Sequence, residues 1–284
     1  MSAVASGGVG DGLGATRAPR GAGSLPATFP PGTFTPSAGR GRLGRMLLAQ
    51  MRTEVVLTLR NGEQVLLTLL IPLALLIGLT VVTIIPLPEP RVDAAVPRIF
   101  ALAVMSSAFT GQAIALGFDR RYGVFKRLAA TAIPPWLLVA GRVLAGLVVV
   151  AIQLVVLGVV AAALGWSASL GGLLWTLGLA VLGALCFGAL GVLLGGTLRA
   201  EWVLVLANLI WFVLVLGGGI IVPASAMAGS VVGEVVRELP SGALAEGMRQ
   251  ALDGGAGPGW QSPVVLVAWG LVAALVAGRT TRVS

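Results

Sequence analysis

The chain has no histidine, one cysteine, Cys186, and one tyrosine, Tyr122, among its 284 residues. Zinc sites, catalytic triads and haem sites usually use histidine or cysteine side chains, so this chain has almost no residues that could form such a centre. Charge is scarce as well, because Asp, Glu, Lys and Arg make up 11% of the residues. These absences argue against an enzyme that carries its own catalytic groups.

Lysine is also nearly absent, since Lys126 is the single lysine among 19 basic residues. A Walker A loop has the pattern Gly-x-x-x-x-Gly-Lys-Ser/Thr, in which the lysine reaches the nucleotide phosphates. Lys126 instead stands in the stretch Gly123-Val124-Phe125-Lys126-Arg127-Leu128. The chain therefore has no P-loop, and we expect it to hydrolyse no ATP by itself.

Apolar residues dominate what is present, at 57% of the chain and a mean hydropathy of +0.98. A soluble domain of this size cannot bury so much apolar surface. A bilayer core of about 30 Å needs about 20 apolar residues in a helix. Runs near that length predict six spans, at about 65–85, 99–118, 136–165, 170–198, 202–222 and 260–278. The predicted fold class is all-α, a polytopic membrane protein with six transmembrane helices.

Two segments precede these spans. Residues 1–40 are rich in Gly, Ala, Pro, Ser and Thr without an apolar period, which predicts a disordered cytoplasmic tail with no secretory signal. Residues 41–62 are predicted to form an amphipathic helix in the inner headgroup layer, ahead of a transmembrane domain at 63–284. The apolar stripe of that helix is Leu43, Leu47, Met51 and Val55, with Arg45, Arg52 and Arg60 interspersed.

The basic residues set the expected orientation. With the N-terminus inside, fifteen of the 19 basic residues lie in inner segments, whereas Arg91, Arg98, Arg237 and Arg249 face outside beside six acids. This asymmetry follows the positive-inside rule and places both termini in the cytoplasm. The net charge of +8 is explained by membrane topology, so no nucleic-acid partner is expected.

The inner loop from Asp119 to Trp136 alternates basic and apolar residues. Tyr122, Phe125 and Leu128 have helical spacing, which favours a short surface helix that offers side chains to a cytoplasmic partner. An ordinary positive-inside loop is the alternative reading.

The outer connection from Gly217 to Ser262 is longer than the spans require. Residues 231–239 are predicted to form an amphipathic segment that Pro240 ends, followed by a second helix capped by Ser241. Glu246 and Arg249 stand three residues apart in the second helix and are expected to pair. Two short re-entrant helices before the last span fit this pattern, and a flexible outer loop is the alternative.

These motifs resemble the membrane subunit of the ABC-type-2 exporter permeases, the group that includes bacterial drug, polyketide and polysaccharide exporters. The resemblance runs from about Leu43 to Arg282. It rests on Asp119-Arg120-Arg121 with Gly123, on Leu128-Ala129-Ala130-Thr131, Pro134 and Gly141-Arg142, and on Pro223, Leu239-Pro240 and Glu246-Gly247-Met248-Arg249. The chain departs from the usual family pattern at Asp119, where the family has glutamate, and at Ala132, where it often has proline.

The resemblance implies a half-transporter in the bacterial cell membrane. Two permease subunits pair, as a homodimer or a homologous heterodimer, and separate ATPase subunits beneath them bind ATP and Mg. No cofactor or metal is then expected on this chain. The implied ATPase-coupling residues are Asp119, Arg120, Arg121, Tyr122, Gly123, Phe125, Lys126, Arg127, Leu128 and Arg142. The implied outer re-entrant residues are Pro223, Glu234, Arg237, Leu239, Pro240, Glu246 and Arg249.

Few polar residues fall within the predicted spans. Gln112, Gln153 and Asn208 are candidates to line a transport pathway, and structural hydrogen bonds between helices are the alternative role. Gly191 and Gly195 form a Gly-x-x-x-Gly step that predicts close helix packing. The apolar lining favours an amphipathic or lipid-like substrate, such as a drug, a lipid or a glycan.

Two other functions compete with the exporter. A membrane-embedded enzyme needs paired acids, histidine or a metal within the spans, and every Asp and Glu lies outside the six runs. A secondary transporter of a hydrophobic small molecule stays open as the alternative, although the sequence has neither a visible inverted repeat nor an acid within the spans.

Overall fold

A computed structural model describes residues 42–83, 87–124, 134–217, 220, 229–254 and 257–280. The predicted tail at 1–40 and the predicted coupling residues Phe125, Lys126, Arg127 and Leu128 lie outside these residues, as does Pro223. Every regular element in the described part of the chain is helical, which confirms the all-α polytopic fold.

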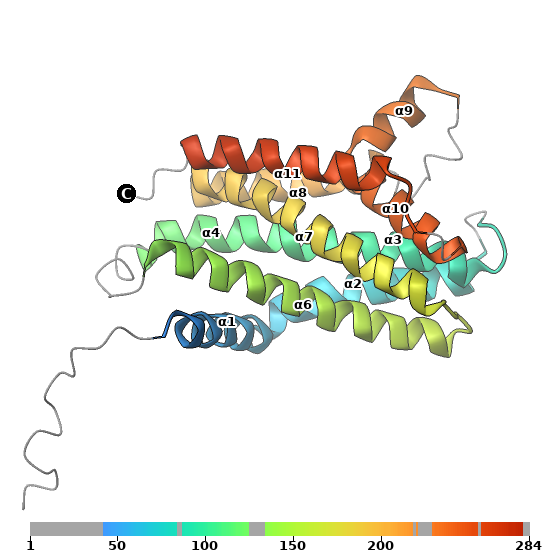
Figure 1. Cartoon of the computed structure of the whole chain (residues 1–284), viewed down its shortest axis with the longest axis horizontal. Helices are drawn as coiled ribbons and strands as arrows, with labels where there is room; N and C mark the ends of the chain where they lie inside the picture. The colour runs from blue at the N-terminus through green and yellow to red at the C-terminus, as the bar shows by residue number, and fades with distance from the viewer. Residues whose placement is uncertain are drawn as a thin grey trace, which may run out of the picture. The chain divides into compact units, whose positions relative to one another are not determined.

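The helices run mostly alongside one another (Figure 1). In chain order they are α1 (Leu43–Arg60), α2 (Gly62–Val81), α3 (Arg91–Met105), the π-helix η1 (Ser106–Gly111), α4 (Gln112–Arg121), α6 (Pro135–Ala163), α7 (Leu170–Thr197), α8 (Ala200–Gly217), α9 (Val231–Glu238), α10 (Pro240–Gly254) and α11 (Gln261–Thr280).

Five helical segments in the described residues are long and apolar enough to cross a membrane: Arg91–Arg121, Trp136–Ala163, Leu170–Thr197, Ala200–Gly217 and Gln261–Thr280. They correspond to the last five predicted spans. The first predicted span overlaps α2, which contains Pro72. Within α2, the segment Thr68–Val81 is a shorter apolar helix. The count of six spans stays a prediction.

The second span differs most from its predicted bounds of 99–118, because the helix begins at Arg91. Arg98, assigned to the outer loop from the sequence, lies inside this helix with 6% of its surface exposed. Its charge interacts with those of Glu246 and Arg249 on α10. Arg98 is therefore buried inside the span, next to α10. A search for uncharged runs instead ends the span at this residue.

Close helix packing occurs at the predicted glycine step. A Cβ atom at Gly191 would lie 2.8 Å from the Phe109 carbonyl oxygen, and one at Gly195 would lie 2.5 Å from that of Ala113. Both distances are too short for any side chain, so α7 meets η1 and α4 backbone to backbone. This contact fixes the second span against the centre of the bundle.

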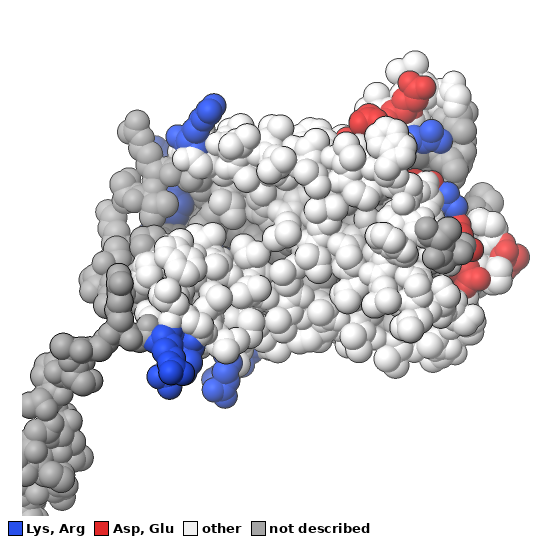
Figure 2. Space-filling view, viewed as in Figure 1, with Lys and Arg blue, Asp and Glu red and all other residues white. Residues whose placement is uncertain are grey.

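Charges gather at the two ends of the described helices, as Figure 2 shows for one face. Arg side chains lie toward the end where α1, α4 and α6 meet, called the inner end below. Acidic side chains appear at the opposite end, near α9 and α10, together with some arginines, and an uncharged belt lies between the two ends. Such a belt is typical of a surface that faces lipid.

Candidate functional site

Three consecutive residues at the end of α4 each contact a different helix. Asp119 forms an ion pair with Arg142 of α6. Arg120 donates from Nη1 to the carbonyl oxygens of Gly195, at 3.1 Å, and Leu198, at 3.3 Å, where α7 ends. These carbonyls lack partners within their own helix, and a cation there also complements the helix dipole.

The third residue, Arg121, forms an ion pair with Glu201 in the first turn of α8, with 2.6 Å between nitrogen and oxygen. Both side chains are at least half exposed, so this pair adds little stability. The pair instead helps to hold α4 in position, because the inner end of α4 contacts α6, α7 and α8.

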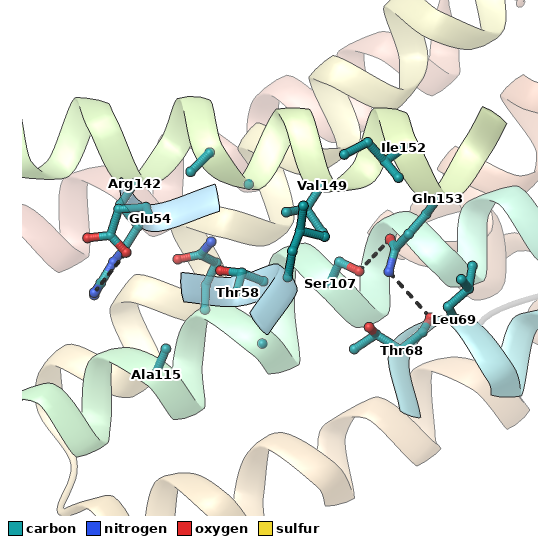
Figure 3. A pocket seen from close by; sticks show the side chains of 15 residues that line it. Glu54, Thr58, Thr68, Leu69, Ser107, Ala115, Arg142, Val149, Ile152 and Gln153 are labelled. Atoms are coloured by element: carbon teal, nitrogen blue, oxygen red, sulfur yellow. Dashed lines mark hydrogen bonds and ion pairs between the residues drawn. The ribbon is translucent and has the colours of Figure 1, made fainter. Parts of the chain in front are cut away.

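Arg142 is the centre of a second set of contacts. Its Nη2 atom also lies 3.8 Å from an oxygen of Glu54 on α1, and Figure 3 shows Arg142 and Glu54 facing one another. We call Glu54, Asp119 and Arg142 the inner charge cluster. Their side chains are 21–25% exposed, so solvent screens the pairs less than at an open surface.

Helix α1 comes close to α6 beside this cluster. A Cβ atom at Gly141 would lie 2.5 Å from Cγ of Gln50, so glycine permits the approach. Gln50 in turn donates from Nε2 to Glu54 at 2.9 Å. Leu48 and Leu57 of α1 are exposed, as expected for a helix in the headgroup layer.

The predicted coupling loop is described only at its two ends. Tyr122 is 65% exposed, and its ring stacks on that of Phe118 with 6.1 Å between centroids. Gly123 has a φ of 65°, a conformation that favours glycine, and α4 has ended just before it. The chain therefore turns immediately before the undescribed residues 125–133.

A crevice of about 100 Å³ extends from the inner charge cluster between α1, α2, α4 and α6. Its polar lining includes Glu54, Thr58, Ser107, Gln112, Arg142 and Gln153, and we call it the polar crevice. Pockets that hold drug-sized ligands have volumes of about 300–1,000 Å³, so the crevice is too small for a whole cargo of that size.

The structure places two of the three candidate pathway residues in the polar crevice and the third elsewhere. Gln112 and Gln153 both line the polar crevice. Asn208 lies on α8, exposed, with its amide donating to the Leu204 carbonyl at 2.8 Å, and it is not part of the crevice lining.

The π-helix η1 contributes to the crevice and was not predicted. Ser107 of η1 donates to Gln153 Oε1 at 2.6 Å, and Ser106 accepts from Trp211 Nε1 at 2.8 Å. π-helical turns inside longer helices often occur at functional sites. The contacts join residues 46 and 105 positions apart, so no local sequence pattern signals them.

Comparison with models of protein families identifies the family of this chain. A model of the family described as ABC-2 type transporter matches residues 45–252, which is well over half of the chain. The chain belongs to the ABC-2 type transporter family. A search of curated proteins found no match to the sequence.

In this ABC-2 type protein α10 packs into the bundle, whereas most of the α9 surface is exposed. Leu244 and Met248 of α10 are fully buried, and α10 contacts α3 and α7. The predicted cap by Ser241 is wrong, since α10 begins at Pro240 and the buried Ser241 hydroxyl has no hydrogen-bond partner among the described residues. Ser230 instead caps α9 by accepting from the Gly233 amide at 3.1 Å.

The expected pair on α10 is present. Arg249 donates to Glu246 at 2.6 and 3.0 Å and to Asp253 at 2.6 Å. Burial of the Glu246 carboxyl opposes ionisation, but hydrogen bonds from Arg249 and Gln250 outweigh it and hold the pKa of Glu246 below its ordinary value. On α9, Glu234 and Arg237 are exposed, and Leu239 is half-buried after its last turn.

Glu54 is the residue of this permease site that sequence reasoning missed. Its signal was present, because Glu54 stands beside Met51 and Val55 of the apolar stripe on α1. An acid at the margin of a stripe predicts a basic partner on the surface that the stripe covers, and that partner is Arg142.

Proposed function

We propose that the chain is the permease subunit of a bacterial exporter of the ATP-binding cassette type. Two copies, or two homologous chains, form the substrate pathway, and separate ATPase subunits that hold ATP and Mg dock at the inner end. The observation that carries the proposal is the inner end itself, where Asp119, Arg120 and Arg121 connect α4 to α6, α7 and α8.

This connectivity suits a coupling element. The loop after Arg121 leads directly into α6, so a partner that displaces the loop pulls on both helices. Arg142 extends the same connection to α1 through Glu54. Helix α6 has 29 residues, a length of about 43 Å that exceeds a bilayer core of about 30 Å. Its first turns therefore reach below the hydrocarbon layer, where a cytoplasmic partner has access to them.

The proposed orientation places the inner end and both termini in the cytoplasm. The excess of Lys and Arg at that end supports it through the positive-inside rule. The pairing of permease subunits and the outward direction of transport carry over from the family resemblance. An amphipathic or lipid-like substrate fits walls that are largely apolar. Family membership favours this function over a secondary transporter.

Purification of the tagged chain from its native membrane tests whether a separate subunit hydrolyses ATP. We expect an ATPase subunit to co-purify and the complex to hydrolyse ATP in a Mg-dependent way. Replacing the Walker A lysine of the partner should abolish this turnover, because this chain has no P-loop. ATP turnover by the chain alone, free of any partner, would show that the proposal is wrong.

A further inference from the structure

Gln112 and Thr58 are polar residues of the crevice lining whose side chains have no hydrogen bond to any described residue. Gln112 is the one on α4. It lies seven residues before Asp119 on α4, about 10 Å deeper into the membrane at helical rise. Its amide fills the space that glycine leaves at position 146, where a Cβ atom would lie 3.0 Å from Nε2. An amide at this depth is costly unless water or a ligand pairs with it.

The other polar side chains of the crevice lining, apart from Thr58, have hydrogen-bond or ion-pair partners. Gln153 is 4% exposed, accepts from Ser107 and donates weakly to the Thr68 carbonyl at 3.4 Å (Figure 3). Glu54 and Arg142 contact one another, and Arg142 also binds Asp119. The uncommitted groups are therefore the Gln112 amide and the Thr58 hydroxyl, each of which can donate and accept hydrogen bonds.

Apolar side chains complete the crevice, among them Leu59, Leu69, Val149 and Ile152. The volume of about 100 Å³ is several times what one water molecule needs. A small neutral head group on an apolar chain matches this combination of size and lining.

We propose that the polar crevice binds the hydroxyl or amide head of a neutral amphipathic molecule, with Gln112 as its hydrogen-bond partner. The inference deepens the proposed function, because it gives the exporter a cargo class and a site within one permease subunit. Its test uses the chain without an ATPase and with reagent on both faces of the membrane, so it does not depend on the proposed coupling or orientation.

The experiment labels a thiol inside the crevice. Ala115 lines the crevice, so Ala115→Cys in a Cys186→Ala background places the only thiol there. Ala151→Cys is the control, since Ala151 is exposed on the membrane-spanning helix α6 and does not line the crevice. Membrane vesicles of the full chain are opened by freezing and thawing and treated with a membrane-impermeant maleimide. We expect Ala115→Cys to react about tenfold faster, because a thiol in water ionises and one in hydrocarbon does not.

Protection then tests binding. 1-Octanol and octanamide should slow the labelling of Ala115→Cys about threefold at roughly twice their dissociation constant, since bound ligand blocks the thiol. Octyltrimethylammonium, which can neither donate nor accept a hydrogen bond, should not protect. Protection should vanish with Gln112→Leu and equally with Gln112→Ala, which adds no bulk.

Three results would overturn the inference. Equal labelling of Ala115→Cys and Ala151→Cys would mean that the crevice is closed to water. Labelling that octanol and octanamide leave unchanged would mean that the crevice holds water only. Protection by octyltrimethylammonium, or protection that survives both Gln112 variants, would reflect general partitioning into the membrane.

Discussion

Arg142→Ala should abolish most ATP-driven transport while leaving the chain in the membrane. The substitution removes the only cation of the inner charge cluster and leaves Asp119 and Glu54 facing the gap. Loss of one partner costs about 3–5 kcal/mol for a fully buried ion pair and about 0–1 kcal/mol at the surface. For side chains that are 21–25% exposed we expect about 1–3 kcal/mol. That loss is enough to free α1 from α6 without unfolding the spans.

The measurement is substrate efflux and ATP hydrolysis by the variant expressed with its ATPase. Arg279→Ala is the matched control, because it removes another arginine of the inner end that is exposed at the end of α11 and forms no ion pair with a described residue. Arg142→Lys should keep part of the activity, since it retains the charge and loses the planar fork. Equal efflux from Arg142→Ala and Arg279→Ala would show that the cluster plays no part in coupling.

Tyr122→Ala together with Phe125→Ala should prevent the ATPase from binding. Tyr122 projects from the inner end with 65% of its surface exposed, and Phe125 follows in the part of the loop outside the described residues. Truncating two aromatic anchors at the centre of an interface costs several kcal/mol, about 2 kcal/mol or more for each hot spot. Topology should not change, because Arg120, Arg121, Lys126 and Arg127 all remain.

Co-purification of the ATPase, with membrane level and topology checked in parallel, gives the readout. Trp260→Ala serves as the control, because Trp260 is 80% exposed at the opposite end of the bundle. Normal complex formation and normal efflux in the double variant would mean that Asp119 to Trp136 is only a solvated connector.

Span positions could be predicted from the sequence because bilayer thickness fixes the length of an apolar helix. The third and fourth spans, predicted at 136–165 and 170–198, form helices at Pro135–Ala163 and Leu170–Thr197. The start of the second span could not be predicted from an uncharged run, because burial of Arg98 near Glu246 depends on α10 packing against α3.

The residues of the candidate site could be predicted where they belong to a sequence motif. They could not be predicted where the packing of distant helices brings them together. The sequence placed Asp119 and Arg142 in one coupling set, and the structure joins them in an ion pair. Glu54 joins them only because Gly141 lets α1 approach α6. Gln112 and Gln153 meet in one crevice while Asn208 lies elsewhere, a separation that depends on which faces of the helices pack together.

Site-directed photo-crosslinking tests most directly whether the ATPase docks at the inner end. A photoreactive amino acid replaces Tyr122, next to the end of α4, in one variant and Trp260, next to the start of α11, in another, which places exposed probes at opposite ends of the helices. Illumination of membranes that contain the assembled transporter should give a covalent adduct between the ATPase subunit and the chain with the probe at position 122, and none with the probe at position 260. An adduct from position 260, or none from position 122 while the two proteins still co-purify, would contradict docking at the inner end.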